Sequence, residues 1–521
     1  MKRISAYIIS AALFLGLITL YSCTKDFEDI NTDPNNPSIE QAAPDMLLTS
    51  TIKAMTDRVH EIFLGHEMGS CWAQQMAKVQ YTDEDRYIPR ASVINNSWRS
   101  FYSASGMDAQ TILKVGHDNY KGVALVLHCY ISSVLTDLFG PIPYTQAWKG
   151  DEYLLPAFDS QETVYRDMIA KLEEANGLLN PDGQAINGDI LYKNDISKWK
   201  KFANSLRLRL LLRMSARDGQ FVATEMKKML ADPTTYPIFE SSADNAALQY
   251  LGAAPNNNPI NENRKTRDDH RVSKNFVDLL VNTYGDYRIM VFANPDALGT
   301  FDGIPNGLTS ALAAAYNGNG LANTSKIGDY FSAATAPGQL MSYAELQFIL
   351  AEAAVRNYID GGMAQAKTYY VAGITGSFDQ YRTPLQAIFT ENAGGNYGGL
   401  SIPDGYTVDD EIAFHTTDAT APSYFDEGSI TKADALKLIA EERYIATFDQ
   451  GLQSWFEWRR SGFPVLTPAQ YGENGGKIPI RVNFPSDEYA TNPGSVAAAK
   501  NLLGGPDDLN TPVWWDTENP N

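Results

Sequence analysis

The sequence predicts a mainly α-helical fold, in which tetratricopeptide-like helical hairpins form a scaffold and long loop-rich insertions lie between them. Three observations carry this prediction. Apolar residues recur at helical spacing in several segments, for example at Trp199, Phe202 and Leu206. One pair of such segments is joined by a turn as short as Asp360-Gly361-Gly362. The pairs are separated by long stretches rich in Gly, Asn and Pro, which are typical of loops.

The first 22 residues have the features of a secretory signal peptide. Lys2-Arg3 provides a positive start, and no charged residue follows before Lys25. The segment ends in Leu20-Tyr21-Ser22-Cys23, which resembles the bacterial lipobox. We therefore expect residues 1–22 to be removed and lipid to be attached to Cys23. The alternative is an uncleaved transmembrane anchor, since roughly 20 apolar residues can span a bilayer.

Residues 23–40 are predicted to form an acidic, extended tether, because few of their side chains can pack into a core. Asp29, Asn31, Asp33 and Glu40 occupy positions 1, 3, 5 and 12 of an EF-hand-like loop. The sharp turn of such a loop needs glycine where this sequence has Pro34. A structural calcium ion is therefore possible but not supported by the sequence, and no cofactor is expected. Residues 41–521 are predicted to form a single helical domain.

The overall charge excludes one class of partner. Lys and Arg number 42 against 62 Asp and Glu, which gives a net charge of −20. Without Lys2-Arg3 the balance is 40 against 62, or −22. Because such a chain is repelled by phosphate backbones, we expect no nucleic-acid binding. An oxidising envelope would permit a Cys71–Cys129 disulfide, but the apolar run around Cys129 favours a buried free thiol.

Helices are predicted wherever the helical spacing persists. A hairpin is predicted over 342–374 and a second helical pair over 431–460. The other predicted helices lie near 41–77, 95–116, 120–138, 160–179 and 197–217. The long loops between them are 232–270, 293–338, 391–430 and 463–521. Structureless stretches of this length are uncommon unless they have a function, so function is expected in the loops.

No catalytic constellation is found in the sequence. His60-Glu61 begins like a zinc-protease motif, but the position for the second histidine is Leu64. Neither a nucleophile elbow nor a phosphate-binding loop occurs. The carboxylates within predicted helices are expected to form salt bridges between packed helices; these are Glu345, Glu352, Glu441 and Glu442. The sequence therefore predicts a binding protein with no catalytic or metal site.

Aromatic residues are the remaining candidates for binding. The chain contains 28 Tyr, 22 Phe and 8 Trp, and such rings offer a flat apolar face that suits sugars and peptide side chains. Those in polar segments, with one arginine able to bond a hydroxyl or carboxylate, are the predicted ligand-binding residues: Trp72, Tyr81, Arg86, Tyr87, Tyr287 and Phe301. An equally open alternative is that these side chains pack to hold the loops.

Several motifs together resemble the SusD/RagB family of nutrient-binding outer-membrane lipoproteins. They extend in order over nearly the whole chain and are Asn31–Pro37, Leu135–Tyr144, Trp199–Met214, Asp286–Arg288, Phe301–Gly307 and Glu442–Gly462. The resemblance implies tetratricopeptide-like helices that face a SusC-like TonB-dependent transporter, and a loop-built face that holds ligand.

The resemblance also implies a function and a location. The expected function is capture of oligosaccharide at the cell surface and its delivery to the transporter, by a protein held in the outer membrane through Cys23. A RagB-like protein that binds oligopeptide is the alternative of the same class. An envelope hydrolase and a purely structural scaffold are the alternatives of other classes. The motifs do not select a ligand, because they are mostly structural.

Overall fold

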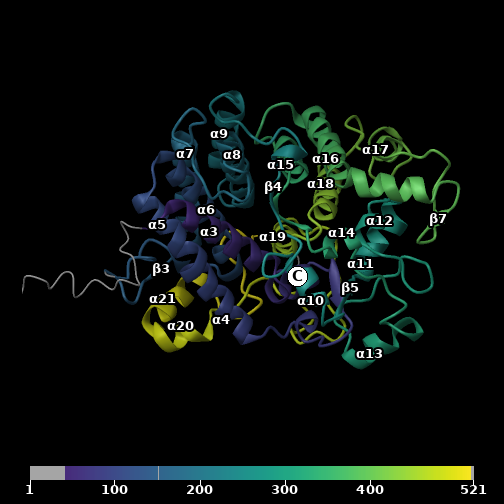
Figure 1. Cartoon of the computed structure of the whole chain (residues 1–521), viewed down its shortest axis with the longest axis horizontal. Coiled ribbons are helices and arrows are strands. Elements are labelled where there is room, and N and C mark those ends of the chain that lie inside the picture. Colours follow the sequence, from purple (N-terminus) through teal and green to yellow (C-terminus); the bar gives the residue numbers. More distant parts are fainter. Residues whose placement is uncertain (1–41, 151, 518–521) are drawn as a thin grey trace, which may run out of the picture.

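A computed structural model describes residues 42–150 and 152–517 and shows a mainly helical protein (Figure 1). The predictions for the signal peptide, Cys23 and the tether fall outside these residues. The helices of the first half are α3 (Pro44–His60), η2 (Ile62–Ser70), η3 (Glu84–Arg86), α4 (Ala91–Arg99), η4 (Ser100–Gly106), α5 (Met107–Val115), α6 (Asp118–Phe139), α7 (Gln161–Leu178), α8 (Ile196–Arg213), α9 (Gly219–Ala231) and η5 (Ser242–Asp244).

The second half alternates short helices with the longer pairs. Its short helices are α10 (Pro259–Arg264), α11 (Lys274–Val277), η6 (Asp278–Tyr284), α12 (Ile289–Phe292), α13 (Ser310–Ala315), η7 (Tyr316–Gly318) and α14 (Asp329–Ser332). The remaining helices are α15 (Tyr343–Val355), α16 (Gly362–Glu391), α17 (Val408–Thr417), α18 (Lys432–Ala446), α19 (Gly451–Ser461), α20 (Ser486–Thr491) and α21 (Pro493–Leu503).

The strands are short and form two-stranded antiparallel pairs. Strand β1 (Met76–Lys78) pairs with β5 (His270–Val272), and β2 (Ile142–Pro143) pairs with β3 (Phe158–Asp159). The other pairs are β4 (Ala246–Gln249) with β6 (Pro337–Met341), and β7 (Asn396–Tyr397) with β8 (Leu400–Ser401).

The predicted hairpin over 342–374 is confirmed as α15 and α16, which pack closely against each other. Two glycines of α16 permit this approach. A Cβ at Gly373 would lie 2.7 Å from the Phe348 ring, and one at Gly376 would lie 2.7 Å from the Tyr343 ring. Ser342 caps α15 by accepting a hydrogen bond from the Glu345 amide. The pair predicted over 431–460 is confirmed as α18 and α19.

Helix α6 is the centre of the scaffold. It packs against α5, α7 and α8, which continue the helical layer shown on one side of Figure 1. In the described part of the chain, α6 alone is long and apolar enough to span a membrane, yet its apolar window is entirely buried. Its hydrophobicity therefore reflects a core position. The main apolar core is continuous from Leu48 to Trp515.

Some predicted boundaries differ from the observed ones. The helix predicted over 41–77 is broken at Glu61, whose ψ of 153° is extended, and η2 follows as a wider helical turn. A Cβ at Gly65 would lie 2.3 Å from the Val59 carbonyl oxygen, so the close packing of η2 against the end of α3 requires glycine at this position. The helix predicted over 197–217 ends at Arg213, and its cap is the side chain of Asp195.

The stretches expected to be loops contain several short elements. Segment 463–521 carries α20 and α21 and returns to the first helices, where the Val482 amide donates to the Leu138 carbonyl at 2.9 Å. The indole of Trp515 donates to Asp137 at 2.7 Å inside the core. The carboxyl-terminal segment thus completes the helical layer, although its sequence is rich in turn residues.

Candidate ligand-binding face

Tyr81 is the most exposed of the six residues predicted to bind ligand. Its side chain is 63% exposed, and the Arg267 guanidinium lies 4.5 Å from the ring centroid. The backbone of Tyr81 has φ of +50°, a left-handed conformation that side chains rarely adopt. Such strain concentrates at functional sites, because the surrounding structure must hold it in place. Tyr81 thus presents a ring with one face held by a cation and a large area open to solvent.

Trp72 and Tyr87 are buried, in contrast to Tyr81. Trp72 has no exposed surface; its indole donates to the Glu84 carbonyl at 2.9 Å, and its ring meets Trp455 edge-on at 5.0 Å. Tyr87 is 3% exposed, and its hydroxyl accepts from the Ala469 amide at 2.9 Å. A ligand would reach either ring only after displacing the residues that cover it. Both side chains therefore support the segment that carries Tyr81.

Arg86 is partly exposed and already bonded within the protein. Its Nε donates to the Tyr471 carbonyl at 3.0 Å, and its Nη2 lies 2.6 Å from Glu473. These contacts attach the segment after Tyr81 to the carboxyl-terminal stretch. The guanidinium stays at the surface, but its charge is partly compensated by Glu473.

Tyr287 and Phe301 lie in a different group, against residues 396–406. Tyr287 is half-buried and its hydroxyl donates to the Ser401 carbonyl at 2.6 Å. Phe301 is buried and stands edge-on to Tyr397 at 5.8 Å. A Cβ at Gly398 would lie 2.1 Å from the Phe301 ring, so glycine is required there. The structure thus divides the six predicted residues between two groups.

Asp85 and Asn306, which are not among the six predicted ligand-binding residues, join the Tyr81 segment to the loop after Phe301. The Asn306 amide donates to Asp85 at 2.7 Å and to the Met76 carbonyl at 2.8 Å. The Gly307 amide donates to the second Asp85 oxygen at 2.8 Å. We call this contact between Asp85, Asn306 and Gly307 the joint. A small apolar cluster lies beside it and contains Ala77, Val79, Ile304, Leu308 and Ala313. No spacing signal identifies these residues, because they are over 200 positions apart.

The joint holds a carboxyl group with an altered pKa. Burial raises the pKa of Asp85 to about 6, although the hydrogen bonds from Gly307 and Asn306 act in the opposite direction. Asp85 has no exposed surface. Its oxygens accept from the backbone amides of Lys78 and Gly307 and from the Asn306 side chain, so the joint is sensitive to the loss of any one donor.

Replacing Asn306 with alanine should lower the free energy of unfolding by about 1–3 kcal/mol, because it leaves buried acceptors without a donor. Urea unfolding of the purified protein measures the change. The matched control is Asn282→Ala, which removes an exposed amide that donates to Asp278 at 3.0 Å. We expect the control to change stability by less than about 0.5 kcal/mol. Equal effects of the two variants would contradict the proposed role of the joint.

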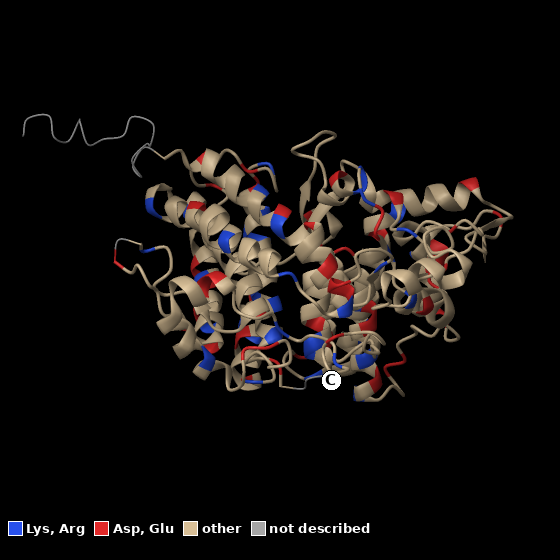
Figure 2. Cartoon of the chain, turned by 90° about the horizontal axis from the view of Figure 1, so that it is seen from below, with Lys and Arg blue, Asp and Glu red and all other residues tan. Residues whose placement is uncertain are grey.

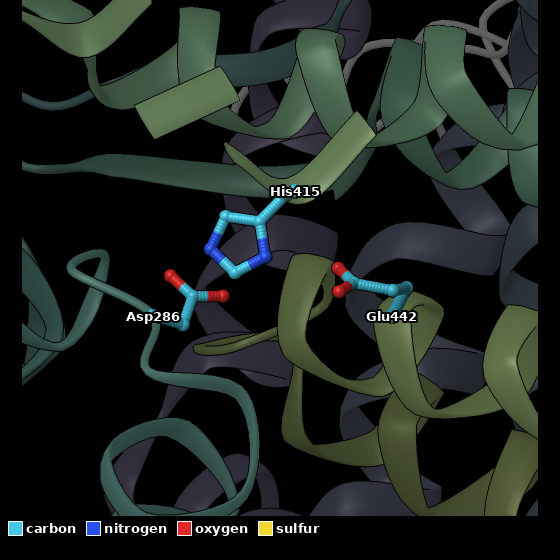
Figure 3. Close-up of side chains that lie close together, drawn as sticks. All are labelled: Asp286, His415 and Glu442. Carbon is cyan, nitrogen blue, oxygen red and sulfur yellow. The ribbon is translucent and has the colours of Figure 1, made fainter. Parts of the chain in front are cut away.

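Asp286, His415 and Glu442 converge inside the protein (Figure 3), and their potential ligand atoms lie within 4.8 Å of one another. The same space is occupied by Arg288, whose Nη2 lies 2.5 Å from Asp286 and 2.7 Å from Glu442. Burial lowers the pKa of His415, but the hydrogen bond to Glu411 and the charge of Asp286 outweigh burial and raise it. The group is an ion-pair cluster centred on a guanidinium.

Glu345 and Glu352 form salt bridges between packed helices, as predicted, and Glu442 pairs with Arg288. The prediction is wrong for Glu441, which lies near a lysine of its own helix. Glu345 lies 2.5 Å from Arg209, and Glu352 lies 2.5 Å from Arg460. Glu457 joins three arginines, at 2.5 Å from Arg213, 2.7 Å from Arg443 and 2.9 Å from Arg460. Acidic and basic residues are accordingly interspersed along the helices (Figure 2). Glu441 accepts from the buried Tyr284 hydroxyl and lies 4.0 Å from Lys437.

Cys71 and Cys129 are both buried and unpaired, so the disulfide that the sequence left open does not form in this structure. Cys129 lies within α6, as its apolar surroundings indicate.

Comparisons with known proteins agree with this architecture. Residues 34–485 match a SusD-like family model described as starch-binding associating with outer membrane. The chain belongs to the SusD-like family. A chitin-binding SusD homologue from Flavobacterium johnsoniae is 25% identical with a TM-score of 0.74, and the match covers 92% of this chain and 98% of that one.

Other SusD-like structures share the fold. A SusD homologue from Bacteroides fragilis is 26% identical with a TM-score of 0.70, covering 91% of this chain and 99% of that chain. A chitin-binding protein at 24% identity has a TM-score of 0.75, covering 91% and 100%. No curated protein matches the sequence. The mainly helical, tetratricopeptide-like SusD fold that the sequence predicts is thereby confirmed.

Proposed function

We propose that this SusD-like protein captures oligosaccharide at the cell surface and hands it to a SusC-like TonB-dependent transporter. The observation that carries the proposal is the family match over residues 34–485, whose description is starch-binding in association with the outer membrane. The chitin-binding relative from Flavobacterium johnsoniae supports the same ligand class, because the similarity extends over nearly both chains.

The face around Tyr81 is the proposed ligand site. An exposed aromatic ring provides the flat apolar surface against which a sugar ring stacks, and its polar surroundings supply hydrogen bonds. The Arg267 guanidinium lies over the Tyr81 ring, and the buried Trp72 and Tyr87 anchor the segment that carries it. A ring held in this way loses little conformational entropy on binding.

A separate apolar surface supports a protein partner. Met107, Tyr153, Leu154 and Leu155 are each at least 39% exposed and line one hollow of about 630 Å³ beside α4 and α20. Clustered exposed apolar side chains mark contact surfaces. We assign this surface to the transporter. Lipid on Cys23 and the tether of residues 23–40 complete the proposal, since they would keep the protein in the outer membrane close to its partner.

Binding without cleavage is part of the proposal. The buried helical carboxylates are engaged by arginines, as Glu352 is by Arg460. A general acid or base must come within hydrogen-bond distance of its substrate. These buried carboxylates cannot do so in the folded protein. The oligopeptide-binding alternative uses the same kind of surface and is separated from the saccharide proposal by experiment.

The Tyr81→Ala variant tests the proposed site. Calorimetry should first measure binding of malto-oligosaccharides, chito-oligosaccharides and a set of oligopeptides to the wild-type protein. We expect saccharide binding, and a loss of about tenfold or more in affinity on removal of the ring, which corresponds to about 1.4 kcal/mol. The control is Tyr489→Ala, which removes a tyrosine that is 40% exposed on α20. If the protein binds peptides but no saccharide, the saccharide proposal is wrong.

A further inference from the structure

A groove of about 830 Å³ lies between α3 and α10. In Figure 1, α10 lies in the lower central part and α3 lies to the left of the centre. Its lining includes one exposed aromatic ring, Phe63, with 41% of its surface open. Three polar side chains in its wall make no hydrogen bond with any residue between 42 and 517 that the structure describes: Ser100, Asn263 and Thr266. An amide and two hydroxyls that both donate and accept are therefore available to a ligand.

The groove is electrically balanced, although the protein as a whole is strongly acidic. Its positive side chains are paired with negative ones: Lys53 with Asp57, Arg58 with Glu61, and Lys265 with Glu262. The net charge of the whole chain is −20. Since no unpaired charge of one sign dominates the groove, a neutral ligand rich in hydroxyl groups fits it better than a charged polymer.

Two sets of contacts connect the groove to Tyr81. On one side, the Arg90 guanidinium lies 4.4 Å from the Phe63 ring and also pairs with Glu84, in the short helix that follows Tyr81. On the other side, Arg267 lies over the Tyr81 ring, and its backbone amide donates to the Asn263 carbonyl at 3.0 Å. Each wall of the groove is thus linked through a single arginine to the segment that carries Tyr81.

We propose that this groove is a second saccharide-binding site, which holds the part of a neutral oligosaccharide that extends beyond Tyr81. The inference rests on the proposed function. Phe63 supplies a second stacking ring, because only one of its faces is covered by Arg90. Asn263 and Thr266 supply hydrogen bonds to hydroxyl groups. The protein would then bind a long chain more tightly than a short one, since a second linked contact strengthens the first.

The dependence of affinity on chain length tests this inference. The probes are malto-oligosaccharides and chito-oligosaccharides of two and six units, measured by calorimetry with the full mature chain. We expect Phe63→Ala to weaken six-unit binding about fivefold to tenfold and to change two-unit binding by less than about twofold. Asn263→Ala should give a smaller loss of the same pattern. Tyr81→Ala should weaken both lengths.

The outcomes separate this inference from the proposed function. If the wild-type protein binds the six-unit probes, and Phe63→Ala and Asn263→Ala bind them with the same affinity as the wild type, the second site is wrong and the proposed function stands. Equal weakening of short and long probes by Phe63→Ala would also overturn the second site. If neither series binds to the wild-type protein, both proposals fall. Leu502→Ala, which truncates an apolar side chain that is 49% exposed on α21, is the control.

Discussion

Replacing Glu457 with glutamine should lower the free energy of unfolding by about 3–5 kcal/mol, because it leaves buried guanidinium groups without their shared counter-charge. Glu457 lies 2.5 Å from Arg213 and 2.7 Å from Arg443, and both arginines are buried. Burial alone would raise the pKa of Glu457, but the charges of Arg443 and Arg460 lower it well below its usual range. The carboxylate is therefore ionised wherever the protein is folded near neutral pH.

Urea unfolding at pH 7 measures this loss. The matched control is Asp360→Asn, which removes the partner of Lys227 from a surface pair whose side chains are 87% and 48% exposed. Exposed pairs contribute little, so we expect a change below about 1 kcal/mol. A Glu457→Gln protein as stable as the control would mean that water or rearrangement compensates the three arginines, and the buried network would then have no large role in stability.

Acid should destabilise the protein strongly between about pH 4.5 and pH 2. Burial raises the pKa of Glu352, but the charges of Arg460 and Arg356 outweigh burial and lower it from 4.5 to about 2. In this range the unfolded chain binds more protons than the folded one, so the free energy of unfolding falls as the pH falls. The lowered pKa of Glu352 corresponds to about 3 kcal/mol of stability. The pKa of Glu67 is also lowered to about 2, in the same direction.

Urea unfolding at a series of pH values from 7 to 3 tests this expectation. Asp85 contributes in the opposite sense, because its raised pKa makes the folded protein bind more protons between about pH 4 and pH 6. Burial lowers the pKa of His60, His66 and His128 from 6.5 to about 4, 3 and 3, so the unfolded chain binds more protons than the folded one below about pH 6.5. Since three histidines outweigh the single Asp85, we expect stability to fall from about pH 6.5 downward. A Glu352→Gln variant should show a shallower fall at low pH. Stability that stays constant down to pH 3 would contradict these pKa shifts.

The scaffold was predictable because local spacing determines it. Residues such as Trp199, Phe202 and Leu206 lie on one helical face, and the structure buries all three in α8. The hairpin of α15 and α16 follows from the same spacing and from a turn that contains glycine at Gly361, where φ is +101°. Such short-range patterns predict the fold well, because the apolar residues that form them are the ones that pack in the core.

The ligand face was less predictable, because contacts between distant segments decide which loop aromatics stay exposed. Trp72 resembles an exposed loop residue in the sequence, but Trp455 and the Glu84 carbonyl enclose it. Tyr87 is covered by Ala469 in the same way. Tyr81 lies in the same segment and remains open, and nothing in its local sequence separates it from the other two. The polar lining of the groove beside Phe63 carries no periodic signal at all.

Cys71 and Cys129, the two thiols among residues 42–517 that the structure describes, are buried and shielded from cysteine reagents in the folded protein. Burial raises the pKa of Cys71 well above its usual value and raises that of Cys129 as well, so neither is a reactive thiolate near neutral pH. Cys71 lies beside the segment that carries Tyr81, whereas Cys129 lies within α6 of the helical layer. Each thiol becomes reactive only when its own surroundings open. The chain therefore carries two natural markers that distinguish local opening of the ligand face from unfolding of the scaffold.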